Sequence, residues 1–224
     1  MPSVRKSYDE ELLQLDTLLA RMGHEAGAAI ESALTALRND DIELARSVVA
    51  RDSQIDAGEH EIEHRCLQLL LRQQPVAGDL RHISTAMKVV TDIERMGDHA
   101  SDIAEIIPHL VTVRKEGDPA VSQAIAMGRK AYQMILDAMD ALTAEDEIAA
   151  RRVIAADDAV DYDFNAIKHT LAQEIAADPA KVDAALDLLM VIKYLERIGD
   201  HAVNVAEWVQ FCLLYTSDAA DDLI

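Results

Sequence analysis

One heptapeptide occurs twice in the chain, as Glu94-Arg95-Met96-Gly97-Asp98-His99-Ala100 and as Glu196-Arg197-Ile198-Gly199-Asp200-His201-Ala202. The two copies lie 102 residues apart and differ at a single position. Nearer the N-terminus, a shift of 105 residues superimposes the two halves, with Met22-Gly23 falling on Met127-Gly128. A three-residue deletion near the turn at Pro75 explains the change of shift. We therefore interpret the chain as a tandem duplication.

The composition and the hydrophobic periodicity of each half predict three long helices. Half of the residues are hydrophobic but only 4% are aromatic, which favours helices around an aliphatic core. Asp118-Pro119 and Asp178-Pro179 each supply an N-cap followed by proline at the first helical position. The expected fold is all-α, a tandem repeat of two three-helix bundles at residues 1–116 and 117–211. The six predicted helices span residues 7–39, 41–72, 77–115, 119–143, 145–177 and 180–211.

The end of the chain is set apart from this fold. Residues 212–224 resemble the translation of a transposon-based sequencing adapter in one reading frame, so we expect a non-native tail there. A genuine acidic tail is the alternative. Removing its three aspartates changes the formal net charge from −20 to −17, so the chain stays acidic. Of the two cysteines, Cys66 is then left as a lone thiol, which we expect to be buried.

The third predicted helix of each half carries carboxylates on a face that begins apolar. In the first half the face continues at helical spacing from apolar residues into Glu94 and Asp98, after Leu80, Ile83, Met87 and Val90. In the second half the same face ends in Glu196 and Asp200. The seam of the second predicted helix also contains an aspartate at a core position in both halves. These residues are Asp52 and Asp157.

Counting from the turn between the second and third helices brings the acidic residues of the first half to the same level. Asp56 lies 19 residues before Pro75, and Glu94 lies 19 residues after it. Asp52 and Asp98 lie 23 residues before and after the same proline. An antiparallel hairpin therefore gathers these four carboxylates.

The second half repeats this arrangement around Pro179. Asp161 and Glu196 lie 18 residues before and 17 residues after that proline. Asp157 and Asp200 lie 22 residues before and 21 residues after it. The sequence therefore predicts a second group of four carboxylates.

Carboxylates gathered in a partly buried seam repel one another unless they are protonated, paired with arginine or bridged by a cation. Ligands that are all oxygen favour Mg, Ca, Mn or Fe, and less ideally Zn. The alternative is a hydrated acidic face, partly neutralised by Arg51, Arg95, Lys193 and Arg197, but the duplication favours metal. We predict His99 and His201 as core or supporting residues. The predicted metal ligands are Asp52, Asp56, Glu94, Asp98, Asp157, Asp161, Glu196 and Asp200.

The two heptapeptides resemble the twin signature of the PhoU family of phosphate-transport accessory proteins. The stretch Gln74-Pro75-Val76-Ala77-Gly78-Asp79-Leu80-Arg81 resembles the turn into the third helix of that family, and the likeness extends over residues 8–211. The resemblance implies two three-helix bundles with metal clusters at the eight carboxylates above. The second half departs from the first at Phe164, opposite Glu59, and at Asn204, opposite Asp102. Its site is thus poorer in carboxylates, and we expect it to bind fewer ions or to bind them more weakly.

The resemblance also implies a function. Family members are negative regulators of the phosphate-starvation response, acting between the phosphate ABC transporter, at its ATPase subunit, and a sensor histidine kinase. We therefore expect a cytoplasmic metal-binding adaptor that is not an enzyme. It should reach the membrane only through its partners, and a homodimer is a further expected form. A net charge of −20 argues against nucleic acid as a partner. The alternatives are a carboxylate-bridged multinuclear metalloenzyme and a metal-free helical scaffold.

Overall fold

The computed structural model describes residues 4–73, 75, 77–114 and 118–221. Within them the chain forms six long helices and no strand. The predicted all-α fold of two three-helix bundles is therefore confirmed. The elements are α1 (Val4–Asn39), α2 (Ile42–Gln73), α3 (Ala77–Val113), α4 (Pro119–Ala144), α5 (Glu147–Ala177), the short 3₁₀ helix η1 (Pro179–Lys181) and α6 (Val182–Asp221).

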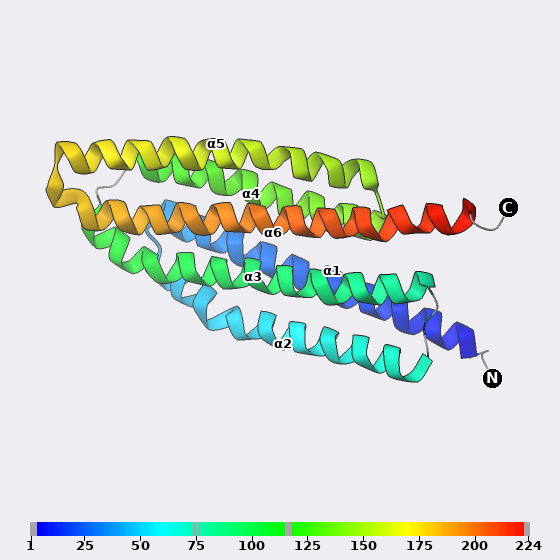
Figure 1. Ribbon diagram of the computed structural model, residues 1–224. Coiled ribbons are helices and arrows are strands. Elements are labelled where there is room, and N and C mark those ends of the chain that lie inside the picture. The colour runs from blue at the N-terminus through cyan, green and yellow to red at the C-terminus, as the bar shows by residue number, and fades with distance from the viewer. Residues whose placement is uncertain (1–3, 74, 76, 115–117, 222–224) are drawn as a thin grey trace.

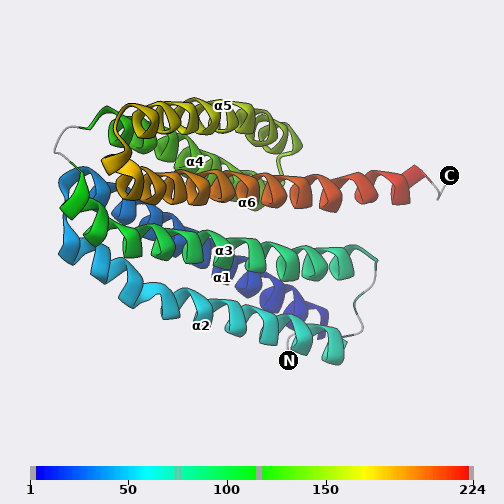
Figure 2. The same cartoon turned by 60° about the vertical axis from the view of Figure 1, so that its left-hand side comes forward.

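The two bundles lie side by side with their helices along one long axis (Figures 1 and 2). Helices α1, α2 and α3 pack together as the first bundle, and α4, α5 and α6 form the second. The bundles meet where α3 packs against α6 and where α1 packs against α4. The two helices that carry the heptapeptides are therefore adjacent at the centre of the molecule.

The turns between the first two helices of each bundle are copies of one another. Asp40 and Glu145 occupy equivalent positions and adopt the left-handed conformation, with φ of 52° and 51°. The following aspartates cap the next helix, because Asp41 Oδ1 accepts the Leu44 amide and Asp146 Oδ1 accepts the amides of residues 148 and 149. The same local chemistry therefore sets the angle between the first two helices of both repeats.

The core is aliphatic, as the composition predicts. On α3, one continuous face is at most 1% exposed, and it consists of Ile93, Met96, Ala100, Ile103 and Ile107. Cys66 is fully buried, which confirms the prediction for this thiol. Burial of such side chains is the main favourable term that holds helices together. Among the described residues, no helix combines the length and hydropathy needed to cross a membrane.

The structure and the predicted helix ends differ most at the last helix. The Asp178-Pro179 cap forms, with Asp178 Oδ1 accepting the Ala180 amide at 3.2 Å, but its first turn is the 3₁₀ helix η1 and α6 begins at Val182. At the other end α6 continues to Asp221, through most of residues 212–224, and extends past the other helices in the view of Figure 2. The expected domain boundary at 116/117 and residues 222–224 lie outside the described residues. A non-native origin for the tail remains a prediction.

Candidate metal centre

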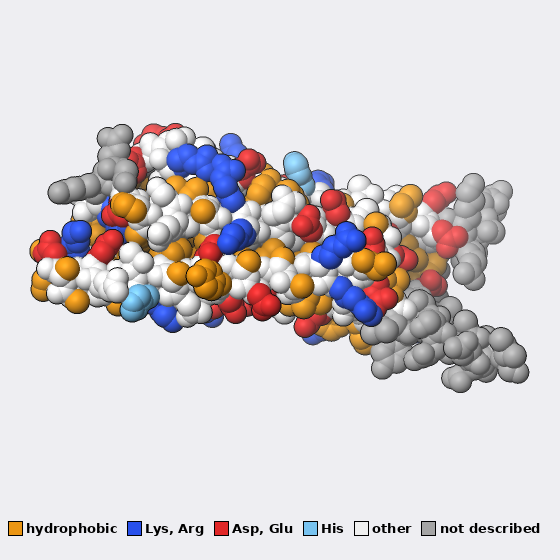
Figure 3. Space-filling view, turned by 90° about the horizontal axis from the view of Figure 1, so that it is seen from above, with side chains coloured by type: hydrophobic (Ala, Val, Ile, Leu, Met, Phe, Trp, Pro, Cys, Tyr) orange, Lys and Arg blue, Asp and Glu red, His pale blue; other side chains and the backbone are white. Residues whose placement is uncertain are grey.

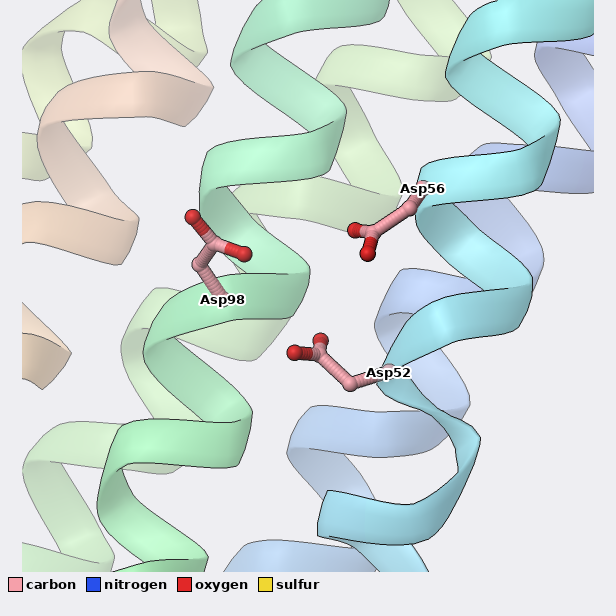
Figure 4. A group of neighbouring side chains, drawn as sticks. All are labelled: Asp52, Asp56 and Asp98. Carbon is pink, nitrogen blue, oxygen red and sulfur yellow. The ribbon is translucent and has the colours of Figure 1, made fainter.

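Three of the predicted ligands meet between α2 and α3. Asp52 and Asp56 lie one turn apart on α2, and Asp98 reaches them from α3. One oxygen of each carboxylate lies within 4.8 Å of the others. In Figure 4, Asp52 and Asp56 point from α2 toward α3, and Asp98 lies on α3 with one oxygen turned toward them. Asp52 and Asp98 are half-buried, whereas Asp56 is exposed at the mouth of this triad. Counting residues from Pro75 therefore placed these three at a common level.

The surroundings of Asp52 disfavour its charged form. Burial raises the pKa of the Asp52 carboxyl, and the charges of Asp98 and Asp56 raise it further. The Ser101 hydroxyl donates a hydrogen bond to Asp52, which opposes that shift. Ser101 is 6% exposed and lies one turn beyond Asp98. Sequence reasoning missed Ser101, because its repeat equivalent is Val203 and it bears no charge.

Glu94, the fourth predicted ligand of the first repeat, lies outside the triad but interacts with it. Burial raises the pKa of Glu94 to about 7, and the charges of Asp98 and Glu59 contribute to the shift. Its Oε2 atom is buried without a hydrogen-bond partner, and the Arg95 guanidinium lies 3.4 Å away. Arg95 also donates to Asp98 Oδ2 at 2.9 Å, so one guanidinium partly neutralises both carboxylates.

The glycines of the two heptapeptides allow close contact between helices. A Cβ atom at Gly97 would lie 2.7 Å from Ile55 Cδ1 on α2, closer than side chains normally approach. A Cβ atom at Gly199 would lie 3.2 Å from Asp157 Oδ1 on α5. Glycine therefore lets the acidic seam of the second helix approach the backbone of the third in both repeats.

The predicted ligands of the second repeat interact without forming a comparable triad among the described residues. Burial raises the pKa of Asp157 to about 6, and the charges of Asp161, Asp200 and Glu196 raise it further. Burial also raises the pKa of Asp200, followed by the charge of Glu196. Asp157 Oδ1 is buried without a hydrogen-bond partner. Four carboxylates thus share one seam, but their oxygens are not gathered as they are in the first repeat.

The two histidines of the heptapeptides occupy the interface between the bundles. The His99 ring is buried, stacks on Tyr194 of α6 at 5.4 Å and lies 5.7 Å from the His201 ring. His201 Nδ1 lies 2.8 Å from Asp92 Oδ1 on α3, which also accepts a 2.9 Å hydrogen bond from Asn204. The histidines therefore link α3 to α6, and each directly follows a predicted metal ligand in the chain.

The first cluster fits a hard cation. Its donors are carboxylate oxygens from two helices. Burial first and neighbouring negative charges second raise the pKa values of Asp52 and Glu94, and a cation would offset both effects. When bound, such an ion supplies positive charge and a cross-link between α2 and α3. The residues that would hold it are Asp52, Asp56 and Asp98, with Glu94 at the edge.

The fold and the site together define a class of protein, the helical tandem repeats that carry carboxylates along the seam between the second and third helices of each bundle. A family model described as the PhoU domain matches the chain twice, over residues 19–107 and 125–209. The chain belongs to the PhoU family.

Individual relatives agree with this assignment. The chain is 40% identical, over 91% of its length and 92% of the relative, to the phosphate-specific transport system accessory protein PhoU homolog of Clostridium acetobutylicum. It is 38% identical to the Caulobacter vibrioides homolog of the same name, over 92% of this chain and 89% of that one. The crystal structure of PhoU from Pseudomonas aeruginosa superimposes with a TM-score of 0.89 at 32% identity, covering 92% of this chain and 98% of that one.

Proposed function

We propose that this chain is a metal-binding regulatory adaptor of phosphate uptake and phosphate-starvation signalling. It acts in the cytoplasm as a negative regulator between the phosphate ABC transporter, at its ATPase subunit, and a sensor histidine kinase. The family match across both repeats supports this role, and so do the names of the relatives, which call them accessory proteins of phosphate transport. The net charge of −20 suits partners with basic surfaces, and acidic and basic side chains are interspersed on the face seen in Figure 3.

The observation that carries the metal-binding part is the convergence of Asp52, Asp56 and Asp98 within 4.8 Å. A divalent or trivalent ion, Fe, Mn, Mg, Ca or Zn, replaces the repulsion between these carboxylates with two or three favourable contacts. Because the ligands come from α2 and α3, the ion fixes the spacing of these helices. A change in metal occupancy therefore alters the spacing of α2 and α3, and with it the surface that the first bundle presents to a partner.

The metalloenzyme alternative gains no support from its own sequence signature. Glu61 and His64 have the Glu-x-x-His spacing of carboxylate-bridged metal sites, but both are exposed. Arg21 donates to Glu61 at 3.3 Å, and Gln68 contacts His64 at 2.7 Å. The relatives are named as accessory or regulatory proteins. We therefore favour the adaptor.

Elemental analysis of purified protein tests metal binding. The Asp98→Ala plus Asp200→Ala variant removes one predicted ligand from each cluster, so bound metal should fall to background after dialysis. The control is Glu43→Ala plus Glu147→Ala, which removes two carboxylates from exposed ion pairs and should keep the metal. Metal retained in the ligand variant would show that the assigned carboxylates do not hold it. Wild-type protein without metal would favour the hydrated scaffold.

A gene deletion tests the adaptor role. Loss of the protein should switch on phosphate-starvation genes in phosphate-rich medium, and normal repression in the deletion strain would reject the role. Pull-downs with the transporter ATPase subunit and with the sensor kinase identify the partners directly. Sedimentation equilibrium of the purified protein decides whether it forms a homodimer.

A further inference from the structure

The two repeats differ most in charge just beyond the predicted ligands. In the first repeat, Glu59 and Glu63 on α2 extend the acidic seam, and the Thr91 hydroxyl on α3 hydrogen-bonds to Glu59. The residues that the duplication places at the same positions in the second repeat are Phe164, Lys168 and Lys193. The formal charge of the three positions therefore changes from −2 to +2.

In the first repeat these positions add to the negative potential of the cluster. Burial and the charge of Glu63 raise the pKa of Glu59, which Thr91 and Arg95 oppose. Glu59 in turn contributes to the raised pKa of Glu94. The carboxylates of this repeat therefore form one continuous field that favours cations.

In the second repeat an ammonium group of the chain itself occupies the corresponding place. Lys193 Nζ donates to Glu196 Oε2, and its charge opposes the raised pKa of Asp200. The same Nζ atom lies 5.5 Å from the centre of the Phe164 ring, and Lys168 Nζ lies 5.0 Å from that ring. Attraction between the ammonium groups and the aromatic ring keeps both lysines close to the seam.

We propose that Lys193, held by Phe164 and Glu196, takes the place of a metal ion in the second repeat, so that the chain binds metal mainly in the first. This inference rests on the metal-binding function proposed above. A tethered ammonium neutralises Glu196 and repels an incoming cation, whereas the first repeat offers no such group at Thr91. Arg95, which pairs with Asp98 in the first repeat, has Arg197 as its counterpart in the second, so the two clusters differ by the ammonium of Lys193.

Binding of Mn²⁺, measured by calorimetry and by elemental analysis after gel filtration, tests the asymmetry. Asp98→Asn should remove most of the bound Mn²⁺, whereas Asp200→Asn should leave it nearly unchanged. Equal losses in the two variants would overturn the inference while leaving the proposed function intact. Wild-type protein that binds no Mn²⁺ would reject both.

The role of Lys193 itself is tested with the first cluster disabled by Asp98→Asn. In that background, Lys193→Thr should tighten Mn²⁺ binding at the second repeat at least about tenfold, because one nearby positive charge is removed. Adding Phe164→Glu and Lys168→Glu, which restores all three residues of the first repeat, should tighten it further. Asp200→Asn should abolish the gain.

Lys130→Thr is the matched control. It also removes one ammonium from the second repeat, and Lys130 is 46% exposed against 42% for Lys193, but its partner is Asp163 at 2.7 Å. Made in the Asp98→Asn background, the Lys130→Thr variant should bind Mn²⁺ with the same affinity as Asp98→Asn alone. A similar gain from Lys130→Thr, or no gain from Lys193→Thr in protein of native helicity, would refute the specific role of Lys193.

Discussion

Replacing Glu94 by glutamine should flatten the pH dependence of stability of the metal-free protein. The Glu94 side chain is 14% exposed, and burial, followed by the charge of Asp98, raises its pKa from 4.5 to about 7. Because its pKa is higher in the folded than in the unfolded chain, protonation of Glu94 favours folding. That contribution is fully present below pH 4.5 and is lost as the pH rises through 7.

The two pKa values set the size of the effect. Proton linkage with a pKa of 4.5 for the unfolded chain and about 7 for the folded chain gives a loss of about 2–3 kcal/mol in unfolding free energy between pH 5 and pH 8. The glutamine in Glu94→Gln is uncharged at both pH values. The variant should therefore lose less unfolding free energy than wild type between pH 5 and pH 8, by the amount that Glu94 contributes. Urea unfolding in the presence of a chelator, followed by circular dichroism at both pH values, measures the difference.

An exposed carboxyl provides the control for this experiment. Glu43→Gln removes a side chain that is 82% exposed, so the loss between pH 5 and pH 8 should stay as in wild type. If Glu94→Gln and wild type lose the same free energy, burial of a charged Glu94 is not what costs stability. Metal added at pH 8 should recover part of the loss in wild type, because a ligand bound to the native state stabilises it.

Three further predictions concern packing and buried groups. Gly128→Ala should cost about 1 kcal/mol, because its Cβ would overlap Leu34 Cδ2, and the strain of about 1–3 kcal/mol exceeds the gain in helix propensity. Arg114→Met should cost about 3 kcal/mol in urea unfolding, since Arg114 is 6% exposed and pairs with Asp118 and Glu174. In Cys212→Ser protein, Cys66 should not react with a thiol reagent until the chain unfolds, because burial raises its pKa to about 12.

Two of these predictions have a control substitution elsewhere in the chain, and the third has an outcome that would contradict it. Gly78→Ala meets no atom within 4 Å and should be neutral or slightly stabilising, so an equal loss there would contradict the packing argument. Arg46→Met breaks an exposed pair and should cost less than about 0.5 kcal/mol; a comparable loss there would show that burial of Arg114 is unimportant. Rapid labelling of Cys66 in native protein would mean that the first bundle opens locally.

The fold was predictable because two independent signals agree. Helical periodicity predicts where the helices lie, and the duplication indicates that both halves pack their three helices in the same way. The paired caps at Asp41 and Asp146 show that even the turns were copied. Contacts between the repeats were not predictable in this way. The stacking of His99 on Tyr194 and the contact of His201 with Asp92 join positions that no repeat pattern relates in advance.

The sequence predicted how far along the hairpin each carboxylate lies, but not where each side chain points around its helix. Counting residues from a turn fixes how far along a hairpin each side chain lies, and this placed Asp52, Asp56 and Asp98 together. It does not fix where a side chain points around its helix. Glu94 satisfies the count equally well, yet it lies outside the triad, with its Oε2 atom beside the Arg95 guanidinium.

A count of carboxylates does not by itself distinguish the two repeats. Asp157, Asp161, Glu196 and Asp200 preserve the spacing of the first cluster, so spacing alone predicts two equal sites. Affinity for a cation depends on the sum of nearby charges, and a single ammonium at Lys193 changes that sum as much as the loss of a carboxylate would. Residues that surround a duplicated motif therefore carry more information about its divergence than the motif itself does.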